Sequence, residues 1–179
     1  MRTAIFYGSS GGTTKSVAEQ IKKALGYDVD LIDVADAKGE EFERYDKIIL
    51  GTSTWGEGDL QDDWEDFFEE FQKVDLSGKK VALFGTGDQE EYPESFVDAM
   101  GILYEQPVSN GAEIVGGGWP LEGYEFDNSR AVVDGAFVGL VIDEDNQPDL
   151  TPFRVSKWVE SIKEEFSSKK GPEEPLRIV

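Results

Sequence analysis

Short apolar runs alternate with amphipathic stretches along most of this chain. The apolar runs predict strands, at residues 3–7, 29–33, 47–51, 80–85 and 112–117. Between them, apolar positions three and four residues apart predict helices, at residues 13–25, 62–73, 94–105 and 152–166. This alternation favours an α/β fold, in which a doubly wound, five-stranded parallel sheet carries helices on both faces.

Residues 118–136 break the alternation. They contain several glycines, and a further apolar run follows at residues 137–141. We therefore predict that an insertion at about 118–136 interrupts the fifth strand, which resumes near residue 137. Residues 1–167 are then predicted to form a single domain, and the polar, proline-containing segment 168–179 a flexible C-terminal tail.

The stretch Ser9-Ser10-Gly11-Gly12-Thr13-Thr14 joins the first predicted strand to the first predicted helix. A helix N-terminus offers unpaired N–H groups and a partial positive charge, while hydroxyls add further donors. The loop lacks the lysine of a Walker A motif and does not read G-x-G-x-x-G. Neutral donors suit the phosphate of flavin mononucleotide (FMN), which is held and never transferred. The alternative is a glycine-rich turn that only caps the helix.

Two further loops follow predicted strands, and each carries an aromatic residue. Residues 51–59 place Trp55 among glycines, where it cannot easily reach the core and is suited to stacking on a flat heterocycle. Residues 85–93 contain Tyr92, which could cover the other face of a ring. Either residue alone could be an ordinary loop aromatic. The phosphate loop at the same end of the sheet favours a shared ligand site, because such sheets bind ligands beyond the carboxyl ends of their strands.

The composition excludes several kinds of chemistry. The 179 residues include no cysteine and no histidine, so disulfides, thiol nucleophiles, Cys or His metal sites and histidine acid–base catalysis are excluded. We expect no metal site. The formal charge of −21 argues against nucleic acid and anionic membranes as partners. Since no signal-peptide pattern or membrane-length apolar run is present, we expect a cytoplasmic monomer.

The negative charge is concentrated in one stretch. Eight acidic residues and no basic residue fall between Glu57 and Glu70. This acidic rim is predicted to attract basic protein partners. The alternative is that acidity only supports solubility or reflects a salty habitat.

Ordered motifs from about residue 3 to about residue 166 resemble those of the flavodoxin family, long-chain type. They are Tyr7-Gly8-Ser9, Gly12, Thr14, Ile49-Leu50-Gly51, Thr54-Trp55, Gly58-Asp59-Leu60, Asp63-Trp64-Glu65, Ala82-Leu83-Phe84-Gly85, Gly87-Asp88-Gln89, Tyr92, Gly123-Tyr124-Glu125-Phe126, Phe137-Val138-Gly139-Leu140 and Asp143-Glu144-Asp145-Asn146-Gln147. The resemblance implies strand order 2-1-3-4-5, with 118–136 as the long-chain insertion. It implies a low-potential one-electron carrier with non-covalently bound FMN, which cycles between semiquinone and hydroquinone. Its partners would be a basic-surfaced reductase donor and a low-potential acceptor enzyme.

The resemblance also implies the residues of the FMN site. The phosphate would be bound by Ser9, Ser10, Gly11, Gly12, Thr13 and Thr14. Thr54 and Asp145 would approach the phosphate or ribityl side, and Trp55 and Tyr92 would flank the isoalloxazine. Backbone groups of Thr86, Gly87 and Asp88 would face the pyrimidine edge, and the Gly56–Glu57 peptide would lie near flavin N5. Ser53 and Gly58, in the same loop, are also candidate cofactor-binding residues. The family usually has Thr in place of Gly11, so one hydroxyl donor is missing here.

Two features are predicted to tune the flavin. A peptide flip at Gly56 would turn its carbonyl toward the proton on N5 in the neutral semiquinone, and glycine tolerates the dihedral angles that this requires. Acidic residues near the ring would disfavour the reduced anion and lower the second potential; they are Glu57, Asp59, Asp88, Glu90 and Glu91.

Two other classes of protein compete with the carrier. A flavin-dependent quinone reductase or nitroreductase on the same fold needs a substrate pocket over the flavin, where Trp55 and Tyr92 are placed instead. A receiver-type signalling domain needs an acidic cluster after the first strand, where this chain has Tyr7-Gly8-Ser9. We therefore expect an electron-transfer protein and no catalytic residue.

Overall fold

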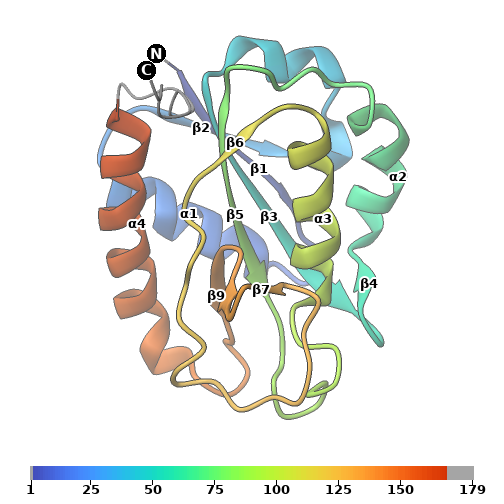
Figure 1. Cartoon of the computed structure of the whole chain (residues 1–179), viewed down its shortest axis with the longest axis vertical. Helices are drawn as coiled ribbons and strands as arrows, with labels where there is room; N and C mark the ends of the chain where they lie inside the picture. Colours follow the sequence, from blue (N-terminus) through green and yellow to red (C-terminus); the bar gives the residue numbers. More distant parts are fainter. Residues whose placement is uncertain (1, 169–179) are drawn as a thin grey trace, which may run out of the picture.

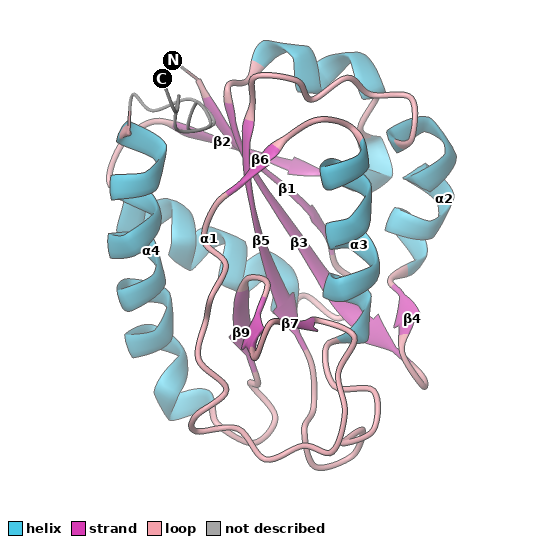
Figure 2. Ribbon diagram, viewed as in Figure 1, coloured by secondary structure: helices cyan, strands magenta, loops and turns pink. Residues whose placement is uncertain are grey.

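The computed structural model describes residues 2–168, in which helices cover both faces of a mostly parallel sheet (Figures 1 and 2). Its long strands are β1 (Thr3–Gly8), β2 (Val29–Asp33), β3 (Lys47–Trp55) and β5 (Lys80–Thr86). Its short strands are β4 (Asp59–Leu60), β6 (Glu113–Ile114) and β9 (Leu140–Ile142). The order β2-β1-β3-β5-β6 is the predicted 2-1-3-4-5 arrangement, with β4 antiparallel to β3.

The α-helices of the described residues form two pairs, one on each face of the sheet (Figure 1). The pair α1 (Thr13–Leu25) and α4 (Thr151–Ser167) covers one face, and the pair α2 (Asp62–Phe71) and α3 (Asp98–Ser109) covers the other. Short 3-10 helices are η1 (Val34–Asp36), η2 (Gly39–Arg44) and η3 (Pro148–Leu150).

The sheet separates two hydrophobic cores. Along β1, Ala4 and Phe6 belong to the core beneath α2 and α3, whereas Ile5 and Tyr7 belong to the core beneath α1 and α4. Side chains alternate between the faces of a strand, and a strand buried on both faces reads as one continuous apolar run. Trp64 of α2 and Trp158 of α4 are fully buried, so these two aromatic side chains belong to the hydrophobic cores rather than to a ligand site.

The fifth strand is interrupted, as predicted. β6 pairs with the start of β5, and β9 pairs with its end. The strand segments are shorter than expected, because pairing ends at Ile114 and resumes at Leu140 rather than near 137. Residues 136–137 instead form β8 (Ala136–Phe137), which makes a hairpin with β7 (Val132–Val133). Asp134 and Gly135 have φ angles of 53° and 81°, as a tight two-residue hairpin turn requires.

The largest of the other departures from the predicted bounds are in α3 and β3. α3 starts at Asp98 rather than at residue 94, because Val97 adopts a left-handed backbone (φ 48°) that interrupts the helix. β3 continues past residue 51 to Trp55, because its end pairs with the unpredicted strand β4.

The domain bounds 1–167 stay a prediction, and residues 169–179 of the predicted tail lie outside the described residues. No helix within residues 2–168 combines the length and the apolar character that crossing a membrane requires.

Candidate functional site

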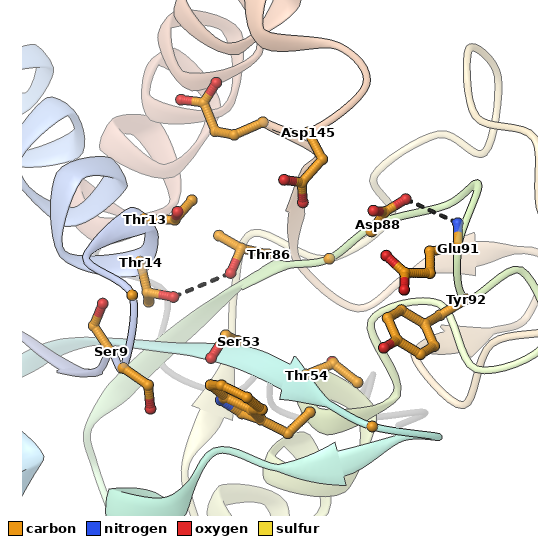
Figure 3. Close-up of a pocket in the computed structure, with 16 residues that line it drawn as sticks. Ser9, Thr13, Thr14, Ser53, Thr54, Thr86, Asp88, Glu91, Tyr92 and Asp145 are labelled. Atoms are coloured by element: carbon orange, nitrogen blue, oxygen red, sulfur yellow. Dashed lines mark hydrogen bonds between the residues drawn. The ribbon is translucent and has the colours of Figure 1, made fainter.

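A cavity of about 270 Å³ lies at the carboxyl ends of β1, β3 and β5 (Figure 3). The three predicted loops converge there, joined by the loop after β9. Its lining residues are Ser9, Ser10, Gly11, Thr13, Thr14, Ser53, Thr54, Trp55, Gly56, Thr86, Gly87, Asp88, Glu91, Tyr92, Glu144 and Asp145. Figure 3 shows the hydroxyls of Ser9, Thr13 and Thr14 at one end, and Asp88, Glu91 and Tyr92 at the other.

Three predicted residues do not line this cavity. Gly12 is the N-cap of α1 and serves the loop through its left-handed backbone (φ 88°). Glu57 lines a neighbouring hollow with Tyr92 and Asp98. Gly58 lies against Asp98, since a Cβ placed on it would be 2.7 Å from Asp98 Oδ2.

Two lining residues were missed as binding candidates, Glu91 and Glu144. Each is a sequence neighbour of a residue that was predicted, Tyr92 or Asp145. Being next to a predicted residue was the one sign in the sequence, but it does not show which side chains of a loop point into the cavity.

The serine and threonine loop is held in shape by its own hydrogen bonds. Ser9 Oγ accepts the backbone N–H groups of Gly12 and Lys15, at 3.1 and 3.4 Å. The Thr14 and Thr86 hydroxyls lie 3.0 Å apart, which joins this loop to the end of β5 (Figure 3). Gln61 Nε2 donates to Ser10 Oγ at 3.0 Å. The loop is therefore preorganised, and two of its N–H groups are already bonded to Ser9.

The remaining donor set fits a phosphate ester. The hydroxyls of Ser9, Ser10, Thr13 and Thr14 lie at the N-terminus of α1, where the helix dipole favours an anion. Ser53 Oγ, from the end of β3, is buried without a hydrogen-bond partner among the described residues. A buried hydroxyl without a partner is costly, so a ligand atom that bonds to it would remove a cost. Among residues 2–168, apart from the two chain neighbours, no atom lies within 4 Å of a Cβ built on Gly11, so a side chain at this position would enter open space.

Two half-exposed aromatic side chains fit a planar ring. Trp55 is 48% exposed and Tyr92 is 36% exposed, and both line the cavity. Trp55 is the last residue of β3, whereas Tyr92 lies in the loop after β5. Large aromatic surfaces left open to water at a cavity are suited to stacking with a flat, partly apolar ligand.

The turn after Trp55 depends on two glycines. Gly58 N–H donates to Trp55 O at 3.2 Å, which closes a four-residue turn. Gly56 has φ 51° and Gly58 has φ 106°, angles that other residues adopt at a cost. A peptide at Gly56 can therefore change orientation with little backbone strain.

Carboxylates line the end of the cavity that contains Tyr92. Burial acts to raise the pKa of Asp88, but hydrogen bonds from the Glu91 N–H, the Asn146 side chain and the Glu90 N–H outweigh it and hold that pKa below its usual range. Burial raises the pKa of Asp145, and the charges of Asp88, Asp143 and Glu91 raise it further. Negative charge introduced here by a ligand would be disfavoured.

Comparisons with known proteins agree with this geometry. The family model described as Flavodoxin matches residues 5–158. The chain is 50% identical over 166 residues to flavodoxin 1 of Escherichia coli, covering 92% of this chain and 94% of that protein. It is 48% identical over 164 residues to a flavodoxin of Synechocystis sp., covering 90% and 96%.

A solved structure of Fusobacterium nucleatum flavodoxin bound to flavin mononucleotide superimposes with a TM-score of 0.87 at 33% identity, covering 92% of this chain and 99% of that one. The excursion between Ile114 and Leu140 is consistent with the long-chain type. The chain belongs to the flavodoxin family.

Proposed function

We propose that this chain is a low-potential one-electron carrier that binds FMN non-covalently and passes electrons between protein partners. The observation that carries the proposal is the cavity itself, with neutral hydroxyls at one end and two half-exposed aromatics among carboxylates at the other. Bound FMN supplies the redox chemistry through its isoalloxazine ring. The alternative, a quinone reductase or nitroreductase, is not favoured, because the relatives that match are named as flavodoxins.

Different lining residues are proposed to bind different parts of FMN. Hydroxyls and backbone groups of residues 9–14, with Ser53 and Thr54, would hold the phosphate and ribityl chain. Thr54 Oγ1 accepts the Ala99 N–H at 3.1 Å, which leaves its own proton free to be donated. Trp55 and Tyr92 would stack on the ring and exclude water, Thr86 to Asp88 would border its polar edge, and Asp145 would approach the phosphate or ribityl side. Gly12, Glu57 and Gly58 would act by shaping the loops.

The Trp55–Gly58 turn is proposed to respond to a proton at flavin N5. The Gly56 carbonyl is the group assigned to accept that proton, because Gly56 already has a positive φ and tolerates reorientation of its peptide. Gly56→Val should change the gap between the two one-electron potentials. An unchanged gap would remove this role from the turn.

The carboxylates are proposed to set a low second potential. Four carboxylates line the cavity: Asp88, Glu91, Glu144 and Asp145. If reduction gave the ring a negative charge, these carboxylates would repel it. Stacked aromatics strengthen the effect, since they exclude the water that would otherwise screen the charges.

The acidic rim is proposed to select basic partners, a reductase as donor and a low-potential enzyme as acceptor. It occupies the β3–β4 turn and α2, beside the cavity, and contains the eight acids between Glu57 and Glu70. Opposite charges accelerate encounter, and salt screens them. The rate of electron transfer from a basic reductase should therefore fall as ionic strength rises. A cytoplasmic, monomeric carrier remains our expectation.

Stepwise reduction with dithionite, followed by the visible spectrum, tests the proposal. Protein as purified, or reconstituted with FMN, should be yellow and should reduce in two resolved one-electron steps. A single two-electron step with rapid direct oxidation of a nicotinamide cofactor would favour the enzyme. Protein that gains no absorbance with added FMN would refute the proposed cofactor.

A further inference from the structure

A buried carboxylate, Asp143, lies behind the cavity at the end of β9. It is 0% exposed. Its Oδ1 accepts the N–H groups of Asp145 and Asn146, at 3.1 and 3.0 Å. Its Oδ2 accepts the Gln89 N–H at 3.0 Å, Gln89 Nε2 at 2.7 Å and Asn146 Nδ2 at 2.9 Å. Both oxygens are thus fully used as acceptors, and no donor of this group comes from outside two loops.

These two loops are the ones that line the cavity from the side of β5 and β9. The loop after β5 contributes Asp88 and Tyr92, and the loop after β9 contributes Glu144 and Asp145. Asn146 Nδ2 also donates to Asp88 Oδ1 at 2.7 Å, so one amide joins the buried carboxylate to a lining residue. Residues 54 positions apart in sequence are held together through Asp143.

Gln89 extends the connection to the inserted segment. Gln89 Oε1 accepts the Glu125 N–H at 2.7 Å, and Gln89 Nε2 donates to Gln147 Oε1 at 3.0 Å. Gln147 Oε1 in turn accepts Arg154 Nη1 at 2.7 Å. Since every polar atom of the Gln89 side chain is bonded, Gln89 has little freedom to move away from Asp143.

We propose that Asp143 is a positioning residue that fixes the two lining loops relative to each other and thereby sets the shape of the cofactor cavity. The proposal rests on the proposed function for the identity of the ligand, but not for the positioning itself. Asp143 is not itself a lining residue; it acts through Gln89, Asn146 and the lining residue Asp145, whose N–H it accepts.

Asp143→Asn separates this role from packing. Asn has nearly the shape of Asp, but one of its two terminal atoms is a donor. If the amide oxygen accepts from Gln89, the new NH2 faces the N–H groups of Asp145 and Asn146. If it turns over, the NH2 faces Gln89. The first orientation loses the two hydrogen bonds that hold the backbone of the loop after β9 and keeps those to Gln89. The second loses the two from Gln89 and the one from the Asn146 side chain, and so separates Asp143 from the loop after β5.

Hydrogen exchange on the apoprotein tests the positioning without any cofactor. The amides of Gln89, Asp145 and Asn146 donate to Asp143, so Asp143→Asn should accelerate exchange in at least one of the two loops by about tenfold, the effect of about one hydrogen bond. Asp149→Asn makes the same change of charge at an exposed position of η3, and should leave both loops as in the wild type. Unchanged exchange at all three amides would overturn the proposal.

The FMN dissociation constant, measured by quenching of flavin fluorescence, tests the consequence. For folded Asp143→Asn we expect it to rise by about tenfold, with a changed gap between the two midpoint potentials. A purely structural role would lower the unfolding free energy and leave the affinity and potentials of the folded protein unchanged, which would also overturn the proposal. If wild-type protein binds no FMN, the proposed function fails while the exchange result still stands.

Asn146→Ala is a second variant that tests the proposal if Asp143→Asn does not fold. It keeps the buried carboxylate and removes only the side chain that links Asp143 to Asp88. Exchange should then accelerate at Glu90 and Glu91, whose N–H groups share Asp88 Oδ1 as acceptor. Equal exchange in this variant and in the wild type would contradict the proposal.

Discussion

Gly8→Ala tests how closely the phosphate loop is built against α2. Gly8 is the buried last residue of β1. A Cβ at this position would lie 2.1 Å from Gln61 Oε1 and 2.6 Å from Trp64 Cδ1. Both neighbours are fully buried, so neither side chain can move into solvent without breaking its own contacts. We expect Gln61 to be displaced.

The cost follows from what Gln61 does. Its Oε1 caps α2 by accepting the N–H groups of Asp63 and Trp64, at 3.0 and 3.2 Å, and losing such a cap costs about 1 kcal/mol. Its Nε2 bonds to Ser10 Oγ at 3.0 Å, a contribution of about 1 kcal/mol. Crowding against Trp64 adds about 1–3 kcal/mol. After a gain of about 0.5–1 kcal/mol from replacing a strand glycine, the expected loss in unfolding free energy is about 2–4.5 kcal/mol.

Urea denaturation of the apoprotein, followed by circular dichroism, measures this loss. Gly11→Ala is the matched control in the same loop, because nothing lies within 4 Å of its Cβ position and we expect a change within about 0.5 kcal/mol. Gly8→Ala combined with Gln61→Ala should lose less than the sum of the single losses, since both act on one contact. If Gly8→Ala lost no more than about 1 kcal/mol beyond the control, the packing argument would be refuted.

Two further predictions concern the ring site. Trp55→Ala should weaken FMN binding by about 1–3 kcal/mol, the value of one stacking contact, in a fluorescence titration. The control, Phe153→Ala, removes a 62% exposed aromatic side chain outside the cavity and should leave the affinity unchanged. Equal affinities in the two variants would contradict the stacking role. Burial raises the pKa of Asp98 above its usual 3.8, although the Arg130 N–H acts to lower it, so the stability that this group contributes is full below pH 3.8 and is lost as pH rises through the folded-state pKa. Relative to Asp98→Asn, the wild type should therefore lose unfolding free energy as pH rises above 3.8, and a pH-independent difference between the two would contradict this assignment.

Most of the fold could be predicted, because the pattern of the chain reflects local periodicity. The predicted helix 13–25 is α1, Thr13–Leu25. The strand order is the one that the family resemblance implied, since periodicity does not give it. The errors fall where long-range contacts decide. β4 exists only because it pairs with the end of β3, and residues 136–137 pair in a hairpin instead of extending β9.

The candidate site was predictable by loop but not by side chain. The three glycine-containing loops meet at one cavity, because the carboxyl ends of parallel strands share one edge of the sheet. Glu57 lines the neighbouring hollow but not the cavity, whereas Glu91 lines both, a difference that depends on backbone turns rather than on residue type. The preformed bonds from Gly12 and Lys15 to Ser9 could not be read from the motif either.

By itself, the sequence determined the layered fold, the absence of cysteine and histidine chemistry, the acidic surface and the loops that form the site. These properties depend on composition and on periodicity over a few residues. From the sequence, Asp143 was only part of a motif that resembles the flavodoxin family. Only the tertiary structure decided that it is a buried hydrogen-bond acceptor for two separate loops. The physical reason is that a buried carboxylate needs several donors, and chain folding alone brings donors from residues 89 and 145–146 to the same two oxygens.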